Sequence, residues 1–410
     1  MGQKKILYYC IVCIGLAHFN LIAITKKCGK EGIVVVPVAD LTLANLKTLY
    51  GEKNTKNLYN SLPFEGKRWS SQACPRAHQL LFNEQVTIIR KQGDEILIEI
   101  PNVFYTTNKG KQHRYWTHKK NIIELEKLKK KGIDLTFLPQ PIDFSTNIYN
   151  TNQNTVTIVE PFHNRKTGQT YSAGTRFVKA RNTNKKGTIP IFALNTNPFR
   201  LKKMNIPKKI CSLKKHTPSE KRKQFVHILK KWAHLHNGFI PYVWGGCSFT
   251  KPYKRGSIQK KLVTVEKKQS IHVFAHKNKN HIAKGFDCTG LVVRAAQICE
   301  IPYFFKNSST VAHSLDKLNR YDDLQNGDIL HINGHIMVVS NIEKNKIIEA
   351  RSHGSGFGKV QEISLGALFQ NIKNYKQLFA TCKNKKLFIR LDSQKKATKK
   401  ITGRFLKLPA

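Results

Sequence analysis

Acidic residues are scarce in this sequence. Its 410 residues include 25 Asp and Glu against 71 Lys and Arg, which gives a formal net charge of +46. Such an excess suits a polyanionic partner such as nucleic acid, anionic lipid or an acidic cell-wall polymer. The basic residues are spread along the whole chain, so the charge marks no particular face, and a generally basic surface explains it as well. No basic-aromatic motif or helix-turn-helix pattern accompanies the charge, so nucleic acid is not an expected partner.

Paired cysteines are also missing. The chain has nine cysteines, but beyond the first 28 residues there is no CxxC pair and no Cys/His cluster with the spacing of zinc ligands. Nothing in their spacing resembles a disulfide framework. We therefore expect neither a bound metal nor another cofactor.

One long apolar run is present, at the N-terminus. Lysines flank the apolar stretch from Ile6 to Ile24 on both sides. A short positive region before an apolar run is typical of a secretory signal peptide. The run is long for that purpose and lacks a clean small-x-small cleavage site, so an uncleaved membrane anchor over residues 1–27 is the alternative. Both interpretations predict export to the periplasm or cell envelope, with membrane contact only through this segment.

The region after the leader has the pattern of small β-sheets. Apolar residues alternate between His78 and Asn102 around a Gly-Asp turn, which predicts a hairpin. Residues 154–182 repeat the strand–turn–strand pattern, with glycines as punctuation. We predict two small all-β units over residues 30–128 and 129–206, neither with an obvious nucleophile. A basic linker is predicted over residues 207–218.

At Ser219 the pattern changes to that of an amphipathic helix. Four apolar residues, Phe225, Ile228, Leu229 and Trp232, share one face of that helix. A second helix and then two strands, in "NGDILHINGHIMVVSN" and "KIIEARSHG", follow. This order predicts a compact α+β domain over residues 219–392 that contains a Lys-rich insertion at 250–284. Residues 393–410 are predicted to form a mobile basic tail.

Cys288 is the candidate nucleophile. It lies in the first turn of the second helix, where unpaired backbone N–H groups and positive potential favour a thiolate. The same N–H groups can stabilise an oxyanion during acyl transfer. Cys299 returns to nearly the same helix face three turns deeper, so we expect it to be an inert core thiol.

A thiolate nucleophile needs a base and a group that orients the base. His335 begins a predicted strand, whereas His331 precedes a turn and is expected to be more exposed. Glu349 on the next strand can accept the second imidazole N–H and fix the tautomer. A carboxylate there is expected to raise the imidazole pKa and to strengthen a thiolate–imidazolium pair.

Four ordered segments carry a family resemblance. "PYVWGG", "FDCTGLV", "GDIL" with "GHIMVV", and "IIEA" resemble the motifs of the NlpC-type murein cysteine peptidases. The resemblance covers residues 219–392, and the upstream units are similar to bacterial SH3-like domains. It implies an α+β fold, with a papain-like cysteine peptidase domain preceded by two small all-β SH3-like barrel modules. It implies Cys288 as nucleophile, His335 as base and Glu349 as the third catalytic residue. Glutamate is less usual there than histidine or asparagine, so His353 stays the alternative.

The resemblance also implies a substrate. Tyr242 would lie at the mouth of the site, and Asp287 and Thr289 would bind the free amine of a short peptide containing L-Ala-γ-D-Glu. The expected reaction is hydrolysis of the γ-D-glutamyl–diamino-acid bond of peptidoglycan stem peptides, in the intact wall or in freed muropeptides. Two alternatives stay open: an amidase or acyltransferase with the same Cys–His pair, and a non-enzymatic cell-wall-binding protein.

Overall fold

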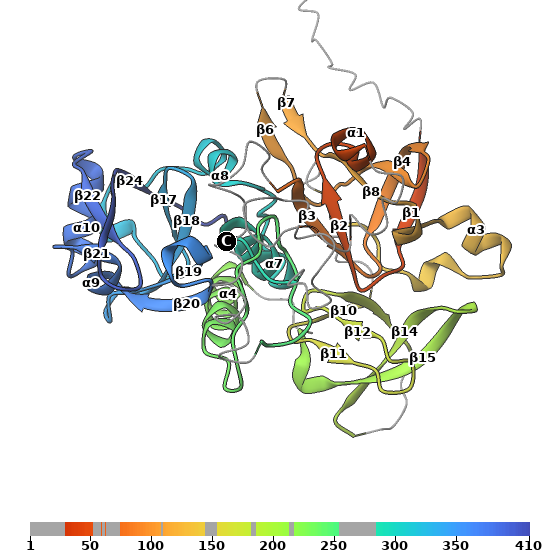
Figure 1. Ribbon diagram of the computed structural model, residues 1–410. Coiled ribbons are helices and arrows are strands. Elements are labelled where there is room, and N and C mark those ends of the chain that lie inside the picture. The colour runs from red at the N-terminus through yellow and green to blue at the C-terminus, as the bar shows by residue number, and fades with distance from the viewer. Residues whose placement is uncertain are drawn as a thin grey trace, which may run out of the picture.

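The structure, a computed structural model, describes most of the chain after the leader. The described residues are 29–51, Tyr59, Leu62, 74–107, 110–143, 154–181, 186–212, 217–253 and 284–410. The predicted leader and most of the Lys-rich insertion lie outside these ranges. Within them, no helix combines the length and the apolar composition needed to cross a bilayer. The described chain forms three parts, which lie beside one another in Figure 1.

The first part is a seven-stranded antiparallel sheet in the order β3-β2-β8-β5-β4-β1-β9. Strands β4 and β5 form the predicted hairpin, and Gly93 in its turn has φ +60°. A small β6–β7 hairpin and two helices, α1 and α3, accompany the sheet. The bounds are β1 Lys30–Val34, β2 Val38–Thr42, α1 Leu46–Tyr50, β3 Arg76–Leu81, β4 Gln85–Gln92, β5 Glu95–Glu99, β6 Tyr105–Thr107, β7 Gly110–Gln112, β8 Arg114–His118, β9 Ile122–Glu124 and α3 Leu125–Lys130.

The second part is a five-stranded sheet in the order β15-β14-β13-β10-β16, with a separate β11–β12 pair. Its last strand ends at Ser212, so the predicted linker at 207–218 contributes to this sheet and is shorter than expected. The bounds are β10 Thr155–Ile158, β11 Phe162–His163, β12 Thr170–Tyr171, β13 Arg176–Lys179, β14 Thr188–Thr196, β15 Phe199–Pro207 and β16 Cys211–Ser212. That either β unit is SH3-like stays a prediction.

The third part begins with helix α4, Pro218–Ala233. Thr217 and Glu220 form a reciprocal capping box, which explains why the helix starts here. The helix ends at the cap residue His234, before Gly238. Helix α7, Cys288–Ile298, packs against α4, and helix α8 covers Ser308–Ser314.

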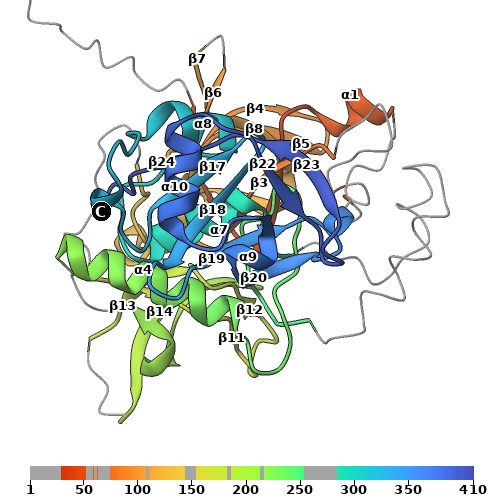
Figure 2. The same cartoon turned by 90° about the vertical axis from the view of Figure 1, so that its left-hand side faces the viewer.

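A five-stranded sheet in the order β20-β19-β18-β17-β24 forms the centre of the third part. Alternate residues of β18 face opposite sides: Ile336 and Val338 pack in the core with α4 and α7, whereas Met337 packs in the core with α10. Figure 2 shows α10, β22 and β23 in front of the sheet and α7 behind it. The bounds are β17 Ile329–Ile332, β18 His335–Asn341, β19 Lys346–Arg351, β20 Lys359–Ser364, α9 Leu365–Leu368, β21 Phe369–Gln370, α10 Tyr375–Lys383, β22 Phe388–Leu391, β23 Ala397–Ile401 and β24 Gly403–Leu406.

The C-terminal residues differ from the prediction of a mobile tail over 393–410. They form β23, which pairs with β22, and β24, which pairs with β17 at the edge of the central sheet. Phe405, Leu406 and Leu408 are buried. The prediction was wrong because the lysines in this segment point to solvent while the apolar residues between them complete both cores.

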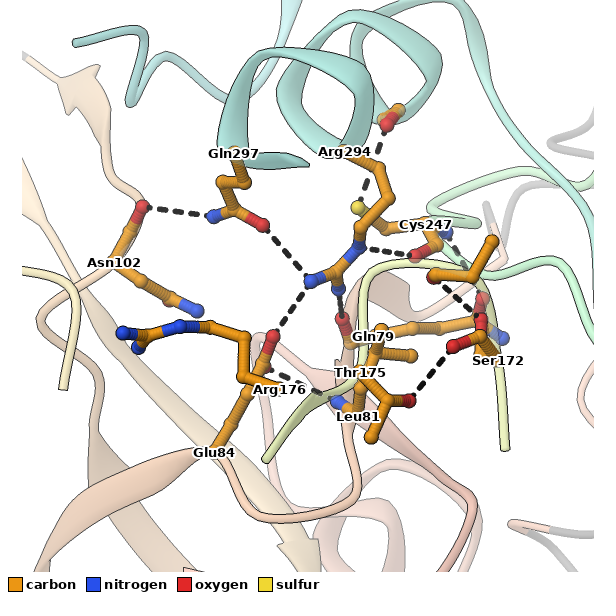
Figure 3. A network of polar contacts seen from close by, with 12 residues as sticks. Gln79, Leu81, Glu84, Asn102, Ser172, Thr175, Arg176, Cys247, Arg294 and Gln297 are labelled. Atoms are coloured by element: carbon orange, nitrogen blue, oxygen red, sulfur yellow. Dashed lines mark hydrogen bonds and ion pairs between the residues drawn. The ribbon is translucent and has the colours of Figure 1, made fainter. Parts of the chain in front are cut away.

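A buried polar network joins the three parts. The guanidinium of Arg294 on α7 donates to the Glu84 carboxylate at 2.6 Å and to the backbone carbonyls of Cys247 and Gln79 at 3.1 and 3.3 Å. Figure 3 shows this guanidinium between residues of the first β unit and the third part, with Ser172 of the second unit beside them. The Ser172 hydroxyl oxygen accepts from the backbone N–H of Phe249 at 2.9 Å. The helix that carries Cys288 is therefore anchored to the first β unit, and Phe249 links the third part to the second β unit.

Candidate active site

Cys288 is the first residue of α7. Asp287 caps the helix by accepting a hydrogen bond from the backbone N–H of Gly290, as expected for an aspartate at this position. Cys288 keeps part of its surface exposed. Its sulfur lies against the backbone N–H groups of Ile336 and Thr289. The thiol therefore sits beside the first residues of β18, the strand that begins with His335.

His335 is held by Glu349 from the neighbouring strand. The two side chains join through Nε2 of His335 and Oε2 of Glu349 at 2.8 Å, and both residues are buried. This contact leaves Nδ1 as the ring nitrogen available to the thiol. The alternative orienting residue, His353, instead lies with its Nε2 3.1 Å from the backbone carbonyl of Tyr242. The structure thus brings Glu349, and not His353, against His335.

The Glu349 carboxylate has further partners that sequence reasoning did not anticipate. Oε2 also accepts from Arg390 on β22 at 2.7 Å, and Oε1 accepts from Gln361 on β20 at 3.0 Å. A second guanidinium, that of Arg351, lies 3.8 Å from Oε1. Burial alone would raise the pKa of Glu349, but Arg390, the bond to His335 and Arg351 lower it to about 2. The carboxylate is therefore charged, and its charge is balanced by arginine.

These surroundings change the expected protonation of Cys288 and His335. Burial and the charge of Arg390 outweigh Glu349 and lower the pKa of His335 to about 4. Burial, followed by the charge of Asp287, raises the pKa of Cys288 to about 12, although the two backbone N–H groups act in the opposite direction. The predicted resting thiolate–imidazolium pair is therefore disfavoured. The desolvated site favours a neutral thiol beside a neutral imidazole.

Asp287 and Thr289 form one hydrogen-bonded unit with a lysine. Thr289 Oγ1 donates to Asp287 Oδ1 at 3.0 Å, and Lys306 Nζ donates to Asp287 Oδ2 at 2.6 Å. Lys306 is 4 % exposed. An internal ammonium thus already occupies the carboxylate that the sequence predicted for a substrate amine.

Tyr242, which the sequence predicts at the mouth of the site, is buried, with 6 % of its surface exposed. Its backbone N–H donates to the carbonyl of Gly358 at 2.9 Å, and its ring meets that of His353 edge-on, with centroids 6.4 Å apart. Gly245, in the turn that follows, has φ +67°, and a Cβ there would lie 2.4 Å from the carbonyl oxygen of Arg76. The "YVWGG" motif therefore forms a tight turn against the first β unit.

Near the Asp287–Lys306 pair lie polar groups that no sequence pattern indicated. The Tyr303 hydroxyl and both ring nitrogens of His78 are buried without hydrogen-bond partners among the described residues. Burial and the charges of Cys288 and Asp287 hold the pKa of Tyr303 well above its ordinary value. His78 belongs to β3, so the first β unit reaches close to Lys306. Only the tertiary fold brings these groups together.

In the part of the chain that the structure describes, no three His, Cys, Asp or Glu side chains gather closely enough to hold a metal ion. The six cysteines there are free thiols. The arrangement of Cys288, His335 and Glu349 is that of a nucleophile, a base and an orienting group, which suits acyl transfer.

Comparison with known proteins addresses the fold. No protein-family model and no curated protein sequence matches the chain. The crystal structure of an NlpC/P60 family protein from Bacillus cereus matches with a TM-score of 0.52 at 15 % identity, over 93 % of this chain and 100 % of that one. NlpC2 from Trichomonas vaginalis (TM-score 0.31, 11 % identity, 83 % of this chain and 94 % of that one) and the peptidoglycan hydrolase RipB from Mycobacterium tuberculosis (TM-score 0.23, 22 % identity, 36 % and 62 %) are much weaker matches. The first of these likenesses, which spans nearly the whole chain, shows that the protein has an NlpC/P60-type fold.

Proposed function

We propose that the protein is an exported cysteine peptidase that hydrolyses the γ-D-glutamyl–diamino-acid bond of peptidoglycan stem peptides. The observation that carries this proposal is the place of Cys288 at the N-terminus of α7, with its sulfur beside the backbone N–H of Ile336, the residue after His335, whose side chain is joined to Glu349 at 2.8 Å. The fold and the family motifs around these residues support the choice of substrate.

In the proposed reaction, His335 Nδ1 accepts the thiol proton as the Cys288 sulfur attacks the γ-carbonyl carbon of D-glutamate. The oxyanion that forms faces the backbone N–H groups at the start of α7. The imidazolium then gives its proton to the departing amine of the diamino acid, and a thioester remains on Cys288. Water, deprotonated by His335, attacks the thioester, which releases the γ-carboxylate and restores the thiol.

The protonation of the resting site agrees with general-base catalysis. Because the thiol and the imidazole are both neutral at neutral pH, the proton moves during the attack and not before it. Glu349 supports the imidazolium that then forms, and Arg390 limits how strongly it does so. Both effects on His335 follow from the buried contacts of the Glu349 carboxylate, which accepts from His335 and from Arg390.

Asp287 and Thr289 remain candidates for binding the free amine of the peptide, and Tyr242 for lining the mouth of the site. A substrate ammonium would have to share Asp287 with Lys306, whose ammonium is only 2.6 Å from the carboxylate. Like charges in a buried site repel strongly. We therefore expect a smaller preference for a free over an N-acetylated terminus than an unoccupied carboxylate would give.

The test is a product analysis with defined peptides. The wild-type protein is incubated with L-Ala-γ-D-Glu-L-Lys and its N-acetylated form, and the product masses are measured. We expect L-Ala-D-Glu and free lysine, with no product from Cys288→Ala and normal product from Cys299→Ala, which removes a buried thiol at the C-terminal cap of the same helix. Release of ammonia or transfer of the acyl group to another amine would instead indicate an amidase or an acyltransferase. Intact peptides in all samples would reject the proposed function.

Export is tested separately. A fusion of residues 1–40 to a reporter that is active only in the periplasm should be active, because residues 1–27 have the pattern of a leader. The same fusion with charged residues placed in the apolar run is the control. A reporter that stays inactive with the natural sequence would reject export.

A further inference from the structure

A row of side chains crosses three strands beside the thiol. In the antiparallel pairing of β17 with β18, His331 lies opposite Ile336, and in the pairing with β24 it lies opposite Arg404. Directly paired residues project on the same face of a sheet. Ile336 packs in the core that includes α7, so this face is the one that carries the helix of Cys288. The row therefore leads from the strand that touches the thiol to the sheet edge.

The two polar members of this row lack partners. Neither the ring of His331 nor the guanidinium of Arg404 has a hydrogen bond or an ion pair with another described residue, although His331 is 8 % exposed and Arg404 is half-buried. The titratable neighbours that act on His331 are Arg404, His313 of α8 and His335, and none of them is acidic. Unpaired donors beside a guanidinium, with no carboxylate among these neighbours, fit an anion.

His331 offers a hydrogen-bond donor to an anion, whereas Arg404 offers the positive charge. Burial and then the charge of Arg404 lower the pKa of His331 to about 4, so its ring is neutral and offers one N–H at neutral pH. Arg404 supplies the charge and a planar pair of N–H donors, which matches a carboxylate.

The position of the row relative to His335 indicates which half of the substrate it meets. His335 must donate a proton to the departing amine, so the amine half lies on the His335 side of the thiol. His331 of β17, the strand next to β18, lies close enough to His335 for the two rings to interact electrostatically, and β24 follows β17 in the sheet. With neighbouring strands about 4.8 Å apart, Arg404 starts roughly 10 Å from Ile336, within reach of the first residue after the cleaved bond.

We propose that Arg404 and His331 form a subsite for the carboxylate of the diamino acid on the leaving-group side. This subsite rests on the proposed function for its substrate. It adds a requirement that the catalytic residues do not impose, namely a free carboxylate on the residue that departs. A peptide in which that carboxylate is amidated is then expected to have a higher KM and a lower kcat/KM.

The experiment compares three peptides: L-Ala-γ-D-Glu-L-Lys, the same peptide with a lysine carboxamide, and the same peptide with the D-glutamate α-carboxylate amidated. For the wild-type protein, the lysine carboxamide should lower kcat/KM roughly tenfold, mainly through KM, as expected for loss of a charged hydrogen-bonded pair. The ratio of kcat/KM for the free acid to kcat/KM for the lysine carboxamide should therefore be about ten in the wild-type protein. In Arg404→Gln this ratio should fall to about one, and Arg404→Lys should restore part of it. His331→Gln is a second variant, expected to reduce the ratio without abolishing it.

The control is Arg200→Gln, which removes the same charge from an exposed position on β15 of the second β unit and should keep the wild-type ratio. An unchanged ratio in Arg404→Gln, or an Arg404-dependent effect confined to the D-glutamate amide, would overturn the assignment. If the wild-type protein cleaves none of the peptides, the proposed function fails, and calorimetric binding of the same peptides to wild type and Arg404→Gln decides the subsite. Equal affinity for the free acid and the lysine carboxamide would then reject it.

Discussion

Glu349 shows how one buried side chain sets the behaviour of the site. Its two carboxylate oxygens accept from His335, Gln361 and Arg390, and the residue is 1 % exposed. A carboxylate in such a place would ordinarily raise the pKa of the imidazole that it holds. Here the arginine offsets that effect, so Glu349 orients His335 more than it charges it.

The role of Glu349 can be separated from that of His353 by kinetics. Glu349→Ala should lower kcat on the order of a hundredfold or more, because the imidazole loses its orientation and its supporting charge. Glu349→Gln, which keeps an acceptor, should fall between wild type and alanine. His353→Ala should stay close to wild type, since its ring contacts the Tyr242 carbonyl and not His335. A large loss of kcat in His353→Ala, together with near wild-type kcat in Glu349→Ala, would instead identify His353 as the residue that orients His335.

Arg390 should control the pH dependence of the reaction. Its charge helps to lower the pKa of His335 to about 4, so in Arg390→Gln that pKa should rise. The imidazole then becomes protonated at higher pH, and the acidic limb of the kcat/KM profile should move toward neutral pH. Arg390→Lys should keep the limb near its wild-type position. An acidic limb that is the same in wild type and Arg390→Gln would show that Arg390 has only a structural role.

Sequence reasoning identified the residues whose position follows from local pattern. Cys288 precedes an apolar helical repeat, and His335 and Glu349 lie on two adjacent predicted strands, so their convergence could be expected. Arg390 and Lys306 lie 41 and 19 residues from the carboxylates that they contact, in segments without any motif. Their partners depend on how β22 and the loop after α7 pack. The expected exposure of His331 was wrong because β24 pairs on its other side.

At the scale of elements, the site needs the N-terminus of α7 and the start of β18 to meet. The sequence predicted α4 and α7 from their apolar periodicity, and the structure adds a capping residue to each, Thr217 in one and Asp287 in the other. It did not predict β23 and β24, because short strands with lysine-rich surroundings resemble a solvated tail. Strand β24 nevertheless closes the edge of the sheet that carries His335.

A truncation tests the importance of the C-terminal strands. Ending the chain at residue 392 removes β23 and β24 and the buried side chains of Phe405, Leu406 and Leu408. Each such side chain contributes about 1.5–3 kcal/mol by burial, so the three together contribute about 5–9 kcal/mol, comparable with the whole stability of many domains. We expect little soluble folded protein, as measured by circular dichroism and thermal unfolding.

The matched control changes the charge of the same segment without removing a strand. Lys399→Gln combined with Lys400→Gln alters two exposed side chains of β23 and should leave the unfolding temperature nearly unchanged. A truncated protein that unfolds at the wild-type temperature would mean that this segment is indeed a tail.

At the scale of the whole molecule, the buried guanidinium of Arg294 joins the third part to the first β unit through Glu84 and Gln79. Burial within the third part also keeps three histidines neutral. The pKa values of His331, His335 and His353 are each lowered to about 4, mainly by burial, from an ordinary value of 6.5.

Stability should therefore depend on pH. Between pH 6.5 and about 4 the unfolded chain binds more protons at these histidines than the folded protein does, so the free energy of unfolding should fall as the pH falls. Urea unfolding at pH 7.5, 6.5 and 5.0 should show a decreasing midpoint. His353→Gln removes one of the three groups and should reduce the slope. A midpoint that stays constant from pH 7.5 to 5.0 would contradict neutral, buried histidines.

The central claim is that Cys288 forms a thioester with the γ-carboxyl group of D-glutamate, and trapping that intermediate tests it most directly. Protein mixed with L-Ala-γ-D-Glu-L-Lys is quenched in acid during turnover, digested and analysed by mass spectrometry. We predict that the peptide containing Cys288 carries an added L-Ala-γ-D-Glu acyl group, and that the peptides containing Cys299 and Cys382 carry none. An acyl group on another residue, or continued hydrolysis by Cys288→Ala, would contradict the account.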